Sequence, residues 1–479
     1  MMGKNLKARL AMWRLKRWLF VLSVSTMLIW FISPPPVFSQ LPMFPKAPSE
    51  DRLKTLFERL DHMSKVDLSK PLTLRECIDI ALERSPDALL SQLDIVSSEL
   101  SLNDARSKYF PQIYLNGTYR FSDRIEFGFE KENYDLGLSA SYTIWDHGHR
   151  EAEVAQRREE LKVTRSRGES RIQQIIYEVT RAYYNLLKAE RLVEVDEEIL
   201  RIARQNTERV RAFMEAGKKI EVDVLAAEVR EANDELQLIQ DKNGLEIARA
   251  DLAMAMGLDP ASQIQVVDDT GYKRFILLGK LEPEGLTLDE AVDRALKNRP
   301  ELEEMRARIK AAEWGVFLAR IDRYPRITAE YGYDVNLDDY LRERESFKNY
   351  RSWSAVARLS FPLFDGGTSR RREQQYEIQL RNLKEQYKSI QYQIMLEVRQ
   401  SYLNIMRARK SLEILDKQVK NAKVTLDITT GRYEQEVATE LEVAEARSLY
   451  AQAMTNRVRA YYDYKIAQAA LKKAMGELR

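Results

Sequence analysis

The sequence has little of the chemistry that enzymes use. It holds one cysteine and three histidines in 479 residues, so it can form no intrachain disulfide and offers few groups for metal binding or acid–base catalysis. The one thiol, Cys77, lies in an amphipathic run, where we expect it to be buried. The sequence also lacks a phosphate-binding loop, a nucleophile motif and a zinc-spaced cluster. We therefore expect no enzyme, with no catalytic residues, no cofactor and no metal site.

The sequence also lacks an excess of charge and, beyond its start, long apolar runs. The net charge is +2, so nothing favours nucleic acid as a partner. A basic segment precedes the apolar run Trp18–Ile32, which at about fifteen residues is short for a membrane-spanning helix. We expect a cleaved export signal over residues 1–39, in preference to a retained membrane anchor, with Gln40 as the first mature residue and no lipid-attachment cysteine. If the mature chain crosses a membrane, we expect strands to do so.

The sequence is rich in internal repetition. Leu72-Thr73-Leu74 returns as Leu286-Thr287-Leu288, 214 positions later, and Ala255-Met256-Gly257 returns as Ala474-Met475-Gly476, 219 positions later. A constant offset over many such points indicates a duplicated unit. We divide the chain into a signal peptide (1–39), an N-terminal linker (40–71), a first repeat (72–257), a connector (258–285) and a second repeat (286–476).

Each repeat predicts helices on either side of two strands. A first helix is expected over about 73–108, with its twin over 287–323, ended by Pro111 and Pro325. Alternating apolar and polar residues then predict strands near 113–121, 136–144, 327–333 and 353–361, long enough to cross a bilayer at a tilt. Polar loops are expected at 122–133 and 334–349. Aromatic residues near the strand ends resemble the girdles of outer-membrane barrels, although a soluble sandwich is an alternative.

A proline-free helical run of about seventy residues follows each strand pair. In the second copy, apolar and small residues from Tyr376 to Leu426 follow steps of three and four, which indicates a coiled-coil seam with one stutter at Ile394–Val398. A further helix is expected over about 220–256. Its length and that of the helix before the strands add up to the length of one long helix. We therefore expect each long helix to lie beside two shorter ones stacked end to end.

The strand-to-helix turns offer one alternative, metal-binding interpretation. Asp146-His147-Gly148-His149 contains ligand-type side chains, but the other copy has Asp365-Gly366-Gly367-Thr368 at the same place. Because the second copy keeps the turn without the histidines, we expect a turn and not a metal site.

Four strands cannot close a barrel, and an open edge in lipid leaves unsatisfied backbone groups. Two copies would give eight strands, which side chains fill, whereas three would give twelve and leave a lumen. Arg120, Glu330 and Arg358 fall on the predicted lumen side, where charge favours water over a packed core. A trimer is thus the smallest assembly expected to conduct.

Taken together, these motifs resemble the TolC-like outer-membrane efflux proteins. The resemblance covers about residues 72–476 and rests on the two Leu-Thr-Leu-x-Glu motifs, Tyr109-Phe110-Pro111 with Tyr324-Pro325, Phe361-Pro362-Leu363-Phe364-Asp365-Gly366-Gly367, and Gly217 followed by Val222-Asp223-Val224-Leu225. It implies a mainly helical α+β chain in which three copies form an α-helical barrel continuous with a twelve-stranded transmembrane β-barrel. It also implies location in the bacterial outer membrane with a long periplasmic extension.

The resemblance further implies partners and site residues. The expected partners are a homotrimer, outer-membrane lipid, a periplasmic adaptor and an inner-membrane pump of RND, ABC or MFS type, acting in efflux or type I secretion. The closed tips would lie near 211–225 and 432–445. The implied sites are a periplasmic aperture (Glu442, Glu445), gate contacts (Asp223, Tyr433) and adaptor-facing tips (Gly217, Lys218, Glu436, Val437). The sequence departs from the pattern at Glu436, which replaces the first tip's glycine, and at Ala438, where some members have an arginine.

Three other interpretations stay open at this point. Glu442 and Glu445 could form an ordinary solvated acidic face. The chain could be a periplasmic adaptor, although that class carries one coiled-coil hairpin and lacks four bilayer-length strands. It could also be a structural coiled coil, which would leave the strands unexplained. The sequence does not name a cargo.

Overall fold

A computed structural model describes residues 54–55, 70–122, 131–268, 271–272, 285–336, 351–435 and 437–478. The chain divides into two compact units, residues 1–61 and 62–479, and every helix and strand named below belongs to the second. The predicted signal peptide and most of the linker lie outside the described residues, as does Glu436. None of the helices in the described part is long and apolar enough to cross a membrane.

The helices come in two sets of equal length. The 11-residue α3 and α8 are followed by the 22-residue α4 and α9, the 67-residue α5 and α11, and the 35-residue α6 and α12. The first set spans Leu74–Arg84, Pro86–Ser107, His149–Glu215 and Glu221–Ala255, and the second spans Leu288–Asn298, Pro300–Ile321, Thr368–Glu434 and Glu440–Ala474. The duplication seen in the sequence is therefore a duplication of structure.

The helix expected over 73–108 is two helices, and so is its twin. Ser85 separates α3 from α4, and Arg299 separates α8 from α9, because Pro86 and Pro300 each begin a new helix. Proline disfavours helical geometry in the residue before it and is well suited to the first helical position. The expectation of one continuous helix was therefore wrong.

The strands form a four-stranded antiparallel sheet in the order β1-β2-β3-β4, as the alternating patterns predicted. Their bounds are Gln112–Ser122, Lys131–Trp145, Arg326–Asn336 and Arg351–Ser360. Strands β2 and β3 extend into segments that were expected to be loops, and pairs such as Asp135 with Asn336 continue the ladder there. Backbone pairing across the sheet overrides the polarity of these residues.

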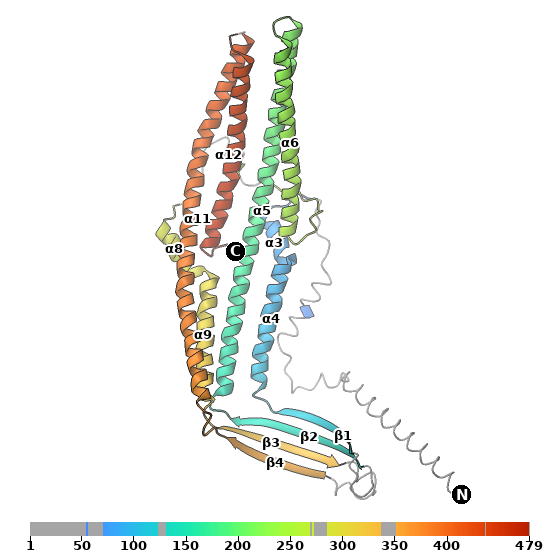
Figure 1. Ribbon diagram of the computed structural model, residues 1–479, viewed down its shortest axis with the longest axis vertical. Coiled ribbons are helices and arrows are strands. Elements are labelled where there is room, and N and C mark those ends of the chain that lie inside the picture. The colour runs from blue at the N-terminus through green and yellow to red at the C-terminus, as the bar shows by residue number, and fades with distance from the viewer. Residues whose placement is uncertain are drawn as a thin grey trace, which may run out of the picture. The chain divides into compact units, whose positions relative to one another are not determined.

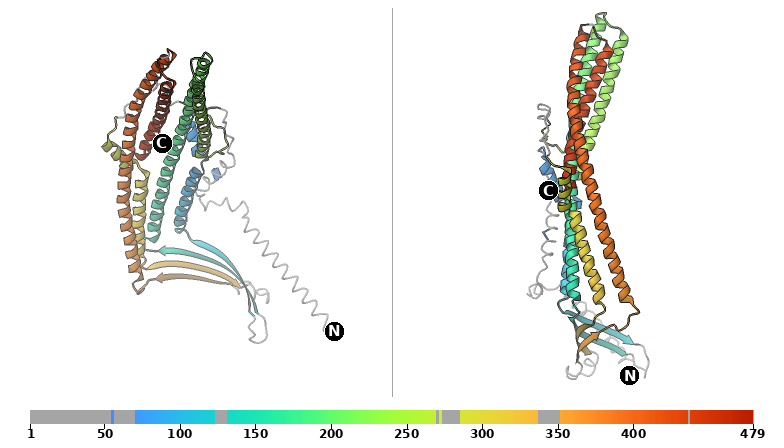
Figure 2. Two further views of the ribbon diagram at one scale, coloured as in Figure 1. Left: turned by 45° about the horizontal axis from the view of Figure 1, so that its top comes forward. Right: turned by 90° about the vertical axis from the view of Figure 1, so that its left-hand side faces the viewer.

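Within this unit the strands adjoin one end of the helices and the two hairpin tips lie at the other (Figures 1 and 2). Helix α5 runs beside α4 and then α6, and α11 runs beside α9 and then α12, so the expected stacking of two shorter helices against one long helix is confirmed. Helix α5 also packs on α9 and α12 of the second repeat.

The seam predicted on α11 is confirmed by burial from Ile394 onward, whereas Tyr376, at its predicted start, is 37% exposed. The seam residues Ile394, Val398, Ile405, Leu412, Val419 and Leu426 are all buried. A second apolar row on the same helix was missed, and it lies exposed: Tyr392, Leu396, Leu403, Met406, Ile414, Val424 and Ile428. Their spacing places all of them on one face of a helix with 3.6 residues per turn, and this spacing is the sequence signal that could have revealed them.

Candidate functional site

The predicted site residues gather at two hairpin tips. At the first tip, Gly217 adopts a left-handed conformation (φ 74°) between α5 and α6, and the Lys218 N–H donates to the Phe213 carbonyl at 2.9 Å. At the second tip, the Val437 N–H donates to the Arg432 carbonyl at 2.9 Å. The same bond thus closes both long helices, and it leaves Gly217, Lys218 and Val437 exposed.

Tyr433 joins the two tips within one chain. Its side chain is 2% exposed, its ring meets the Phe213 ring edge-on at 6.0 Å, and the Lys219 Nζ lies 5.0 Å from its centroid. Burial, followed by the charges of Glu440 and Asp223, raises the pKa of Tyr433 to about 12. The phenol therefore stays neutral near pH 7. The structure places Asp223, the other predicted gate residue, close enough to act on Tyr433 through its charge.

One charged contact between the hairpins is a cluster that was not predicted from the sequence. Glu440, at the start of α12 and 6% exposed, accepts from Asn206 Nδ2 of α5 at 2.8 Å and from Arg230 Nη1 of α6 at 3.3 Å. We call these three residues the Glu440 cluster. Asn206 stands in line with the buried Ala203 and Val210, and a polar residue on such an apolar seam is a sequence signal for a specific buried contact.

The Glu440 cluster is incompletely satisfied. Asn206 Oδ1 and Glu440 Oε2 are buried and have no hydrogen-bond partner within the described part of the chain. An unsatisfied buried polar atom costs about 1–3 kcal/mol. Separation of the hairpins would let water reach these atoms and would offset part of the cost of breaking the contact.

Glu442 has a local structural role. Its carboxylate accepts from the Thr439 backbone N–H at 2.6 Å, while the Thr439 hydroxyl accepts from the Glu442 N–H at 3.3 Å. This capping box starts α12, as its counterparts start α3 and α8. The bonds from Thr439 lower the pKa of Glu442. Both Glu442 and Glu445 are exposed, and they are three positions apart on one helix, so both carboxylates are available to solvent.

The predicted lumen residues lie on the sheet, far along the chain from the tips. Arg358 Nη2 of β4 contacts Glu330 Oε2 of β3 at 3.3 Å. Arg120 lies in β1, and its side chain is outside the described residues. Glu330 and Arg358 therefore form a second polar region, separate from the tips. Arg120 lies eight positions along β1 from Gln112, the residue level with Glu330 across β2, so the sheet does not bring it together with the other two.

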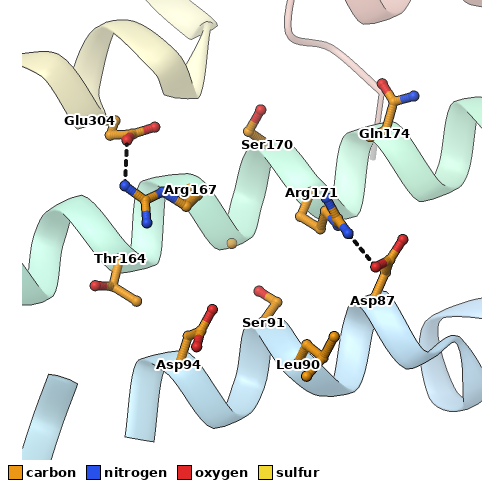
Figure 3. Close-up of a pocket in the computed structure, with 11 residues that line it drawn as sticks. Asp87, Leu90, Ser91, Asp94, Thr164, Arg167, Ser170, Arg171, Gln174 and Glu304 are labelled. Atoms are coloured by element: carbon orange, nitrogen blue, oxygen red, sulfur yellow. Dashed lines mark hydrogen bonds and ion pairs between the residues drawn. The ribbon is translucent and has the colours of Figure 1, made fainter. Parts of the chain in front are cut away.

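A polar groove between α4 and α5 carries no candidate site. Its volume is about 420 Å³, and its charged residues are largely paired, Arg171 with Asp87 and Arg167 with Glu304 (Figure 3). Gly168 lines it, where the second repeat has Tyr387. A Cβ atom at Gly168 would lie 2.8 Å from Ser91 Oγ of α4, so glycine allows the close approach of α4 to α5 here.

Comparison with known proteins adds to these findings. A sequence profile described as outer membrane efflux protein matches residues 77–258 and 291–477. The chain is 25% identical over 417 residues to Protein CyaE of Bordetella pertussis, covering 85% of this chain and 84% of that protein. It is 23% identical over 411 residues to the outer membrane protein TolC of Vibrio cholerae, covering 85% and 91%.

Solved structures share the fold. The chain superposes on CusC with a TM-score of 0.72 at 18% identity, over 84% of this chain and 92% of that one. It superposes on VceC of Vibrio cholerae with a TM-score of 0.71 at 19% identity, over 84% and 96%.

Proposed function

The chain belongs to the outer membrane efflux protein family, and from this premise we propose that three copies form the exit duct of a tripartite efflux or type I secretion system. A periplasmic adaptor and an inner-membrane pump of RND, ABC or MFS type would deliver the cargo to the hairpin tips. The observation that carries the proposal is an apolar helix face that one chain leaves uncovered.

The duplication indicates what covers that face. Leu187 and Val195 of α5 belong to a buried cluster with Val458 of α12. Their counterparts 219 positions on, Met406 and Ile414 of α11, are 50% and 60% exposed. Val458 likewise has an exposed counterpart on α6, Ile239, at 59%.

We infer that α11 of one copy packs on α6 and α4 of the next, as α5 packs on α12 and α9 within a chain. Such head-to-tail contacts close a ring. Three copies would supply the twelve strands that leave a lumen.

The first test of this proposal is Leu403→Asp, in the exposed row of α11. A charge buried in an interface without a partner is costly, so the detergent-purified variant should lose the trimer mass of the unaltered protein and its conductance in planar bilayers. The matched control is Gln400→Asp, an exposed position on the same helix outside the row, which should remain trimeric and conduct. A wild-type protein that is monomeric and never inserts would contradict the exit-duct proposal.

At the tips we propose that Gly217, Lys218, Glu436 and Val437 face the adaptor, and that Asp223 and Tyr433 help to hold the closed state. The exposure of Gly217, Lys218 and Val437 supports the first assignment. The burial of Tyr433 against Phe213 supports the second.

We further propose that Glu442 and Glu445 of three chains line a cation-favouring aperture. Glu442→Gln with Glu445→Gln should lower cation-over-anion selectivity severalfold, because six carboxylates are removed from the narrowest point. Glutamine at position 442 can keep the capping box, so circular dichroism should show unchanged helix content. Reversal-potential measurements in a salt gradient test this, and an unchanged selectivity would remove both residues from the aperture.

A further inference from the structure

The start of α5, next to the turn that follows β2, holds a buried arginine whose side chain is not needed to form that turn. The Asp146 side chain accepts a hydrogen bond from the backbone N–H of Arg150 at 3.3 Å. In the second repeat, the Asp365 side chain accepts the same bond from the backbone N–H of Ser369 at 2.8 Å. The second repeat thus builds the same turn with serine in place of arginine. The turn alone therefore does not account for the Arg150 side chain.

Arg150 is held in one orientation. Its Nε donates to Asp146 Oδ2 at 2.8 Å, and its guanidinium carbon lies 5.3 and 5.7 Å from the ring centroids of Tyr109 and Tyr142. The residue is only 9% exposed, yet its Nη1 atom has no hydrogen-bond partner within the described part of the chain. A buried guanidinium nitrogen without an acceptor is costly, so an acceptor from another molecule would be stabilised here.

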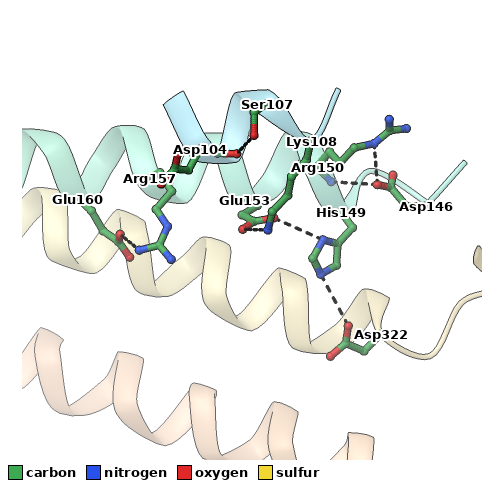
Figure 4. Close-up of polar contacts among 10 residues, drawn as sticks. All are labelled: Asp104, Ser107, Lys108, Asp146, His149, Arg150, Glu153, Arg157, Glu160 and Asp322. Atoms are coloured by element: carbon green, nitrogen blue, oxygen red, sulfur yellow. Dashed lines mark hydrogen bonds and ion pairs between the residues drawn. The ribbon is translucent and has the colours of Figure 1, made fainter. Parts of the chain in front are cut away.

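Arg150 lines a cavity of about 340 Å³ where strands β1, β2 and β3 meet the start of α5. Three acidic groups around this cavity pair with cations: Glu153 Oε1 with Lys108 at 2.5 Å, Asp146 with Arg150, and Glu330 with Arg358. Glu153 Oε2 is buried without a hydrogen-bond partner in the described part of the chain, and it lies 4.0 Å from His149 Nδ1. Figure 4 shows Glu153 between Lys108 and His149, whose other ring nitrogen is 3.9 Å from Asp322.

Arg326, which also lines the cavity, makes no ion pair with any described residue. Its charge and the Nη1 atom of Arg150 are therefore the two uncommitted cationic features, beside the neutral donor Gln112. The second repeat has Ser369 in place of Arg150 and Arg372 in place of Glu153, so this arrangement occurs once per chain.

We propose that this cavity is a binding site for an oxyanion, carried by a phosphate or carboxylate group, with Arg150 and Arg326 as its ligands. Guanidinium groups suit such anions because they carry a permanent positive charge and planar N–H donors. In Arg150 the free donor is Nη1, since Nε donates to Asp146 and Nη2 to the Ile144 carbonyl at 3.5 Å.

Phe110 and Tyr142 also line the cavity, so an apolar group attached to the anion would contact aromatic side chains. The anion could belong to a phospholipid headgroup or to a small soluble molecule, and the two sources are separable by experiment.

The test uses the full-length protein in detergent. Glycerol phosphate is titrated calorimetrically as the soluble probe, and retention of phosphatidylglycerol against phosphatidylcholine is measured by native mass spectrometry. We expect saturable binding of one anion per chain by at least one probe. Binding of glycerol phosphate assigns a soluble anion, and selective retention of phosphatidylglycerol alone assigns a headgroup.

Two variants test the assigned residues. Arg326→Gln and Arg150→Ser should each weaken binding about tenfold or more. Arg150→Ser copies the arrangement of the second repeat and should therefore fold. Arg320→Gln is the matched control, because Arg320 lies in the last turn of α9, pairs with Glu373 and is outside the cavity. The affinity of this variant for the anion should stay within about twofold of that of the unaltered protein. The proposal is overturned if neither probe saturates, or if all three variants lose binding equally.

Discussion

Replacing Gly257 by alanine is expected to destabilise the folded chain by about 3 kcal/mol or more. Gly257 follows α6 with φ 71°, a conformation in which a side chain is strained. A Cβ atom there would lie 2.9 Å from the Arg84 carbonyl oxygen and 2.9 Å from the Ser85 Cα. Both are backbone atoms at the break between α3 and α4, so neither can move without displacing a helix.

Gly217→Ala separates the two causes. Gly217 has a similar φ of 74°, but no heavy atom lies within 4 Å of a Cβ built on it. This variant should cost only about 1 kcal/mol. Thermal unfolding followed by circular dichroism should therefore rank the unaltered protein first, Gly217→Ala slightly below it and Gly257→Ala far below. Equal losses for the two variants would show that the close approach to α3 is not what requires glycine.

Breaking the Glu440 cluster is expected to open the tips. Glu440→Ala leaves Arg230 and Asn206 without their shared acceptor and removes a charge-assisted bond between the hairpins. If the closed state depends on this contact, the ratio of open to closed channels should rise about tenfold or more, the size of a coupling of 1–3 kcal/mol. Single-channel recording should show larger or longer openings than in the unaltered protein.

Glu228→Ala is the matched control for that experiment. Glu228 pairs with Arg211 at 2.6 Å, and this contact joins α5 to α6 within one hairpin. Its loss should leave the opening ratio unchanged. If Glu440→Ala behaves like Glu228→Ala, the Glu440 cluster does not hold the closed state and another contact, such as Tyr433 with Phe213, must do so.

Local patterns predicted much of the architecture. Alternation of apolar residues found the four strands, the steps of three and four found the buried seam of α11, and the two offsets found the duplication. Each of these signals depends on residues close in sequence or on the repeat itself. The loop expected at 334–349 was too long because the pairing of β3 with β2, which decides where the strand ends, involves residues nearly two hundred positions away.

The candidate site was predictable only in part. Tyr433 and Asp223 came from the family resemblance, and the structure adds the reason that Tyr433 is buried. Glu440 was missed because it resembles the neighbouring Glu442 and Glu445 in sequence. Its distinction arises from Asn206 and Arg230, which lie more than two hundred positions earlier.

The sequence by itself determined the duplicated plan, the lengths of the long helices, and the family. These depend on periodicity, capping and repetition, which can be detected within short segments of the chain or by comparing its two repeats. Only the tertiary structure decided which charged groups are paired, which glycine meets a neighbouring backbone, and which apolar row on α11 faces outward. Those properties depend on contacts between residues far apart in sequence, and burial in such contacts gives chemically identical side chains different roles.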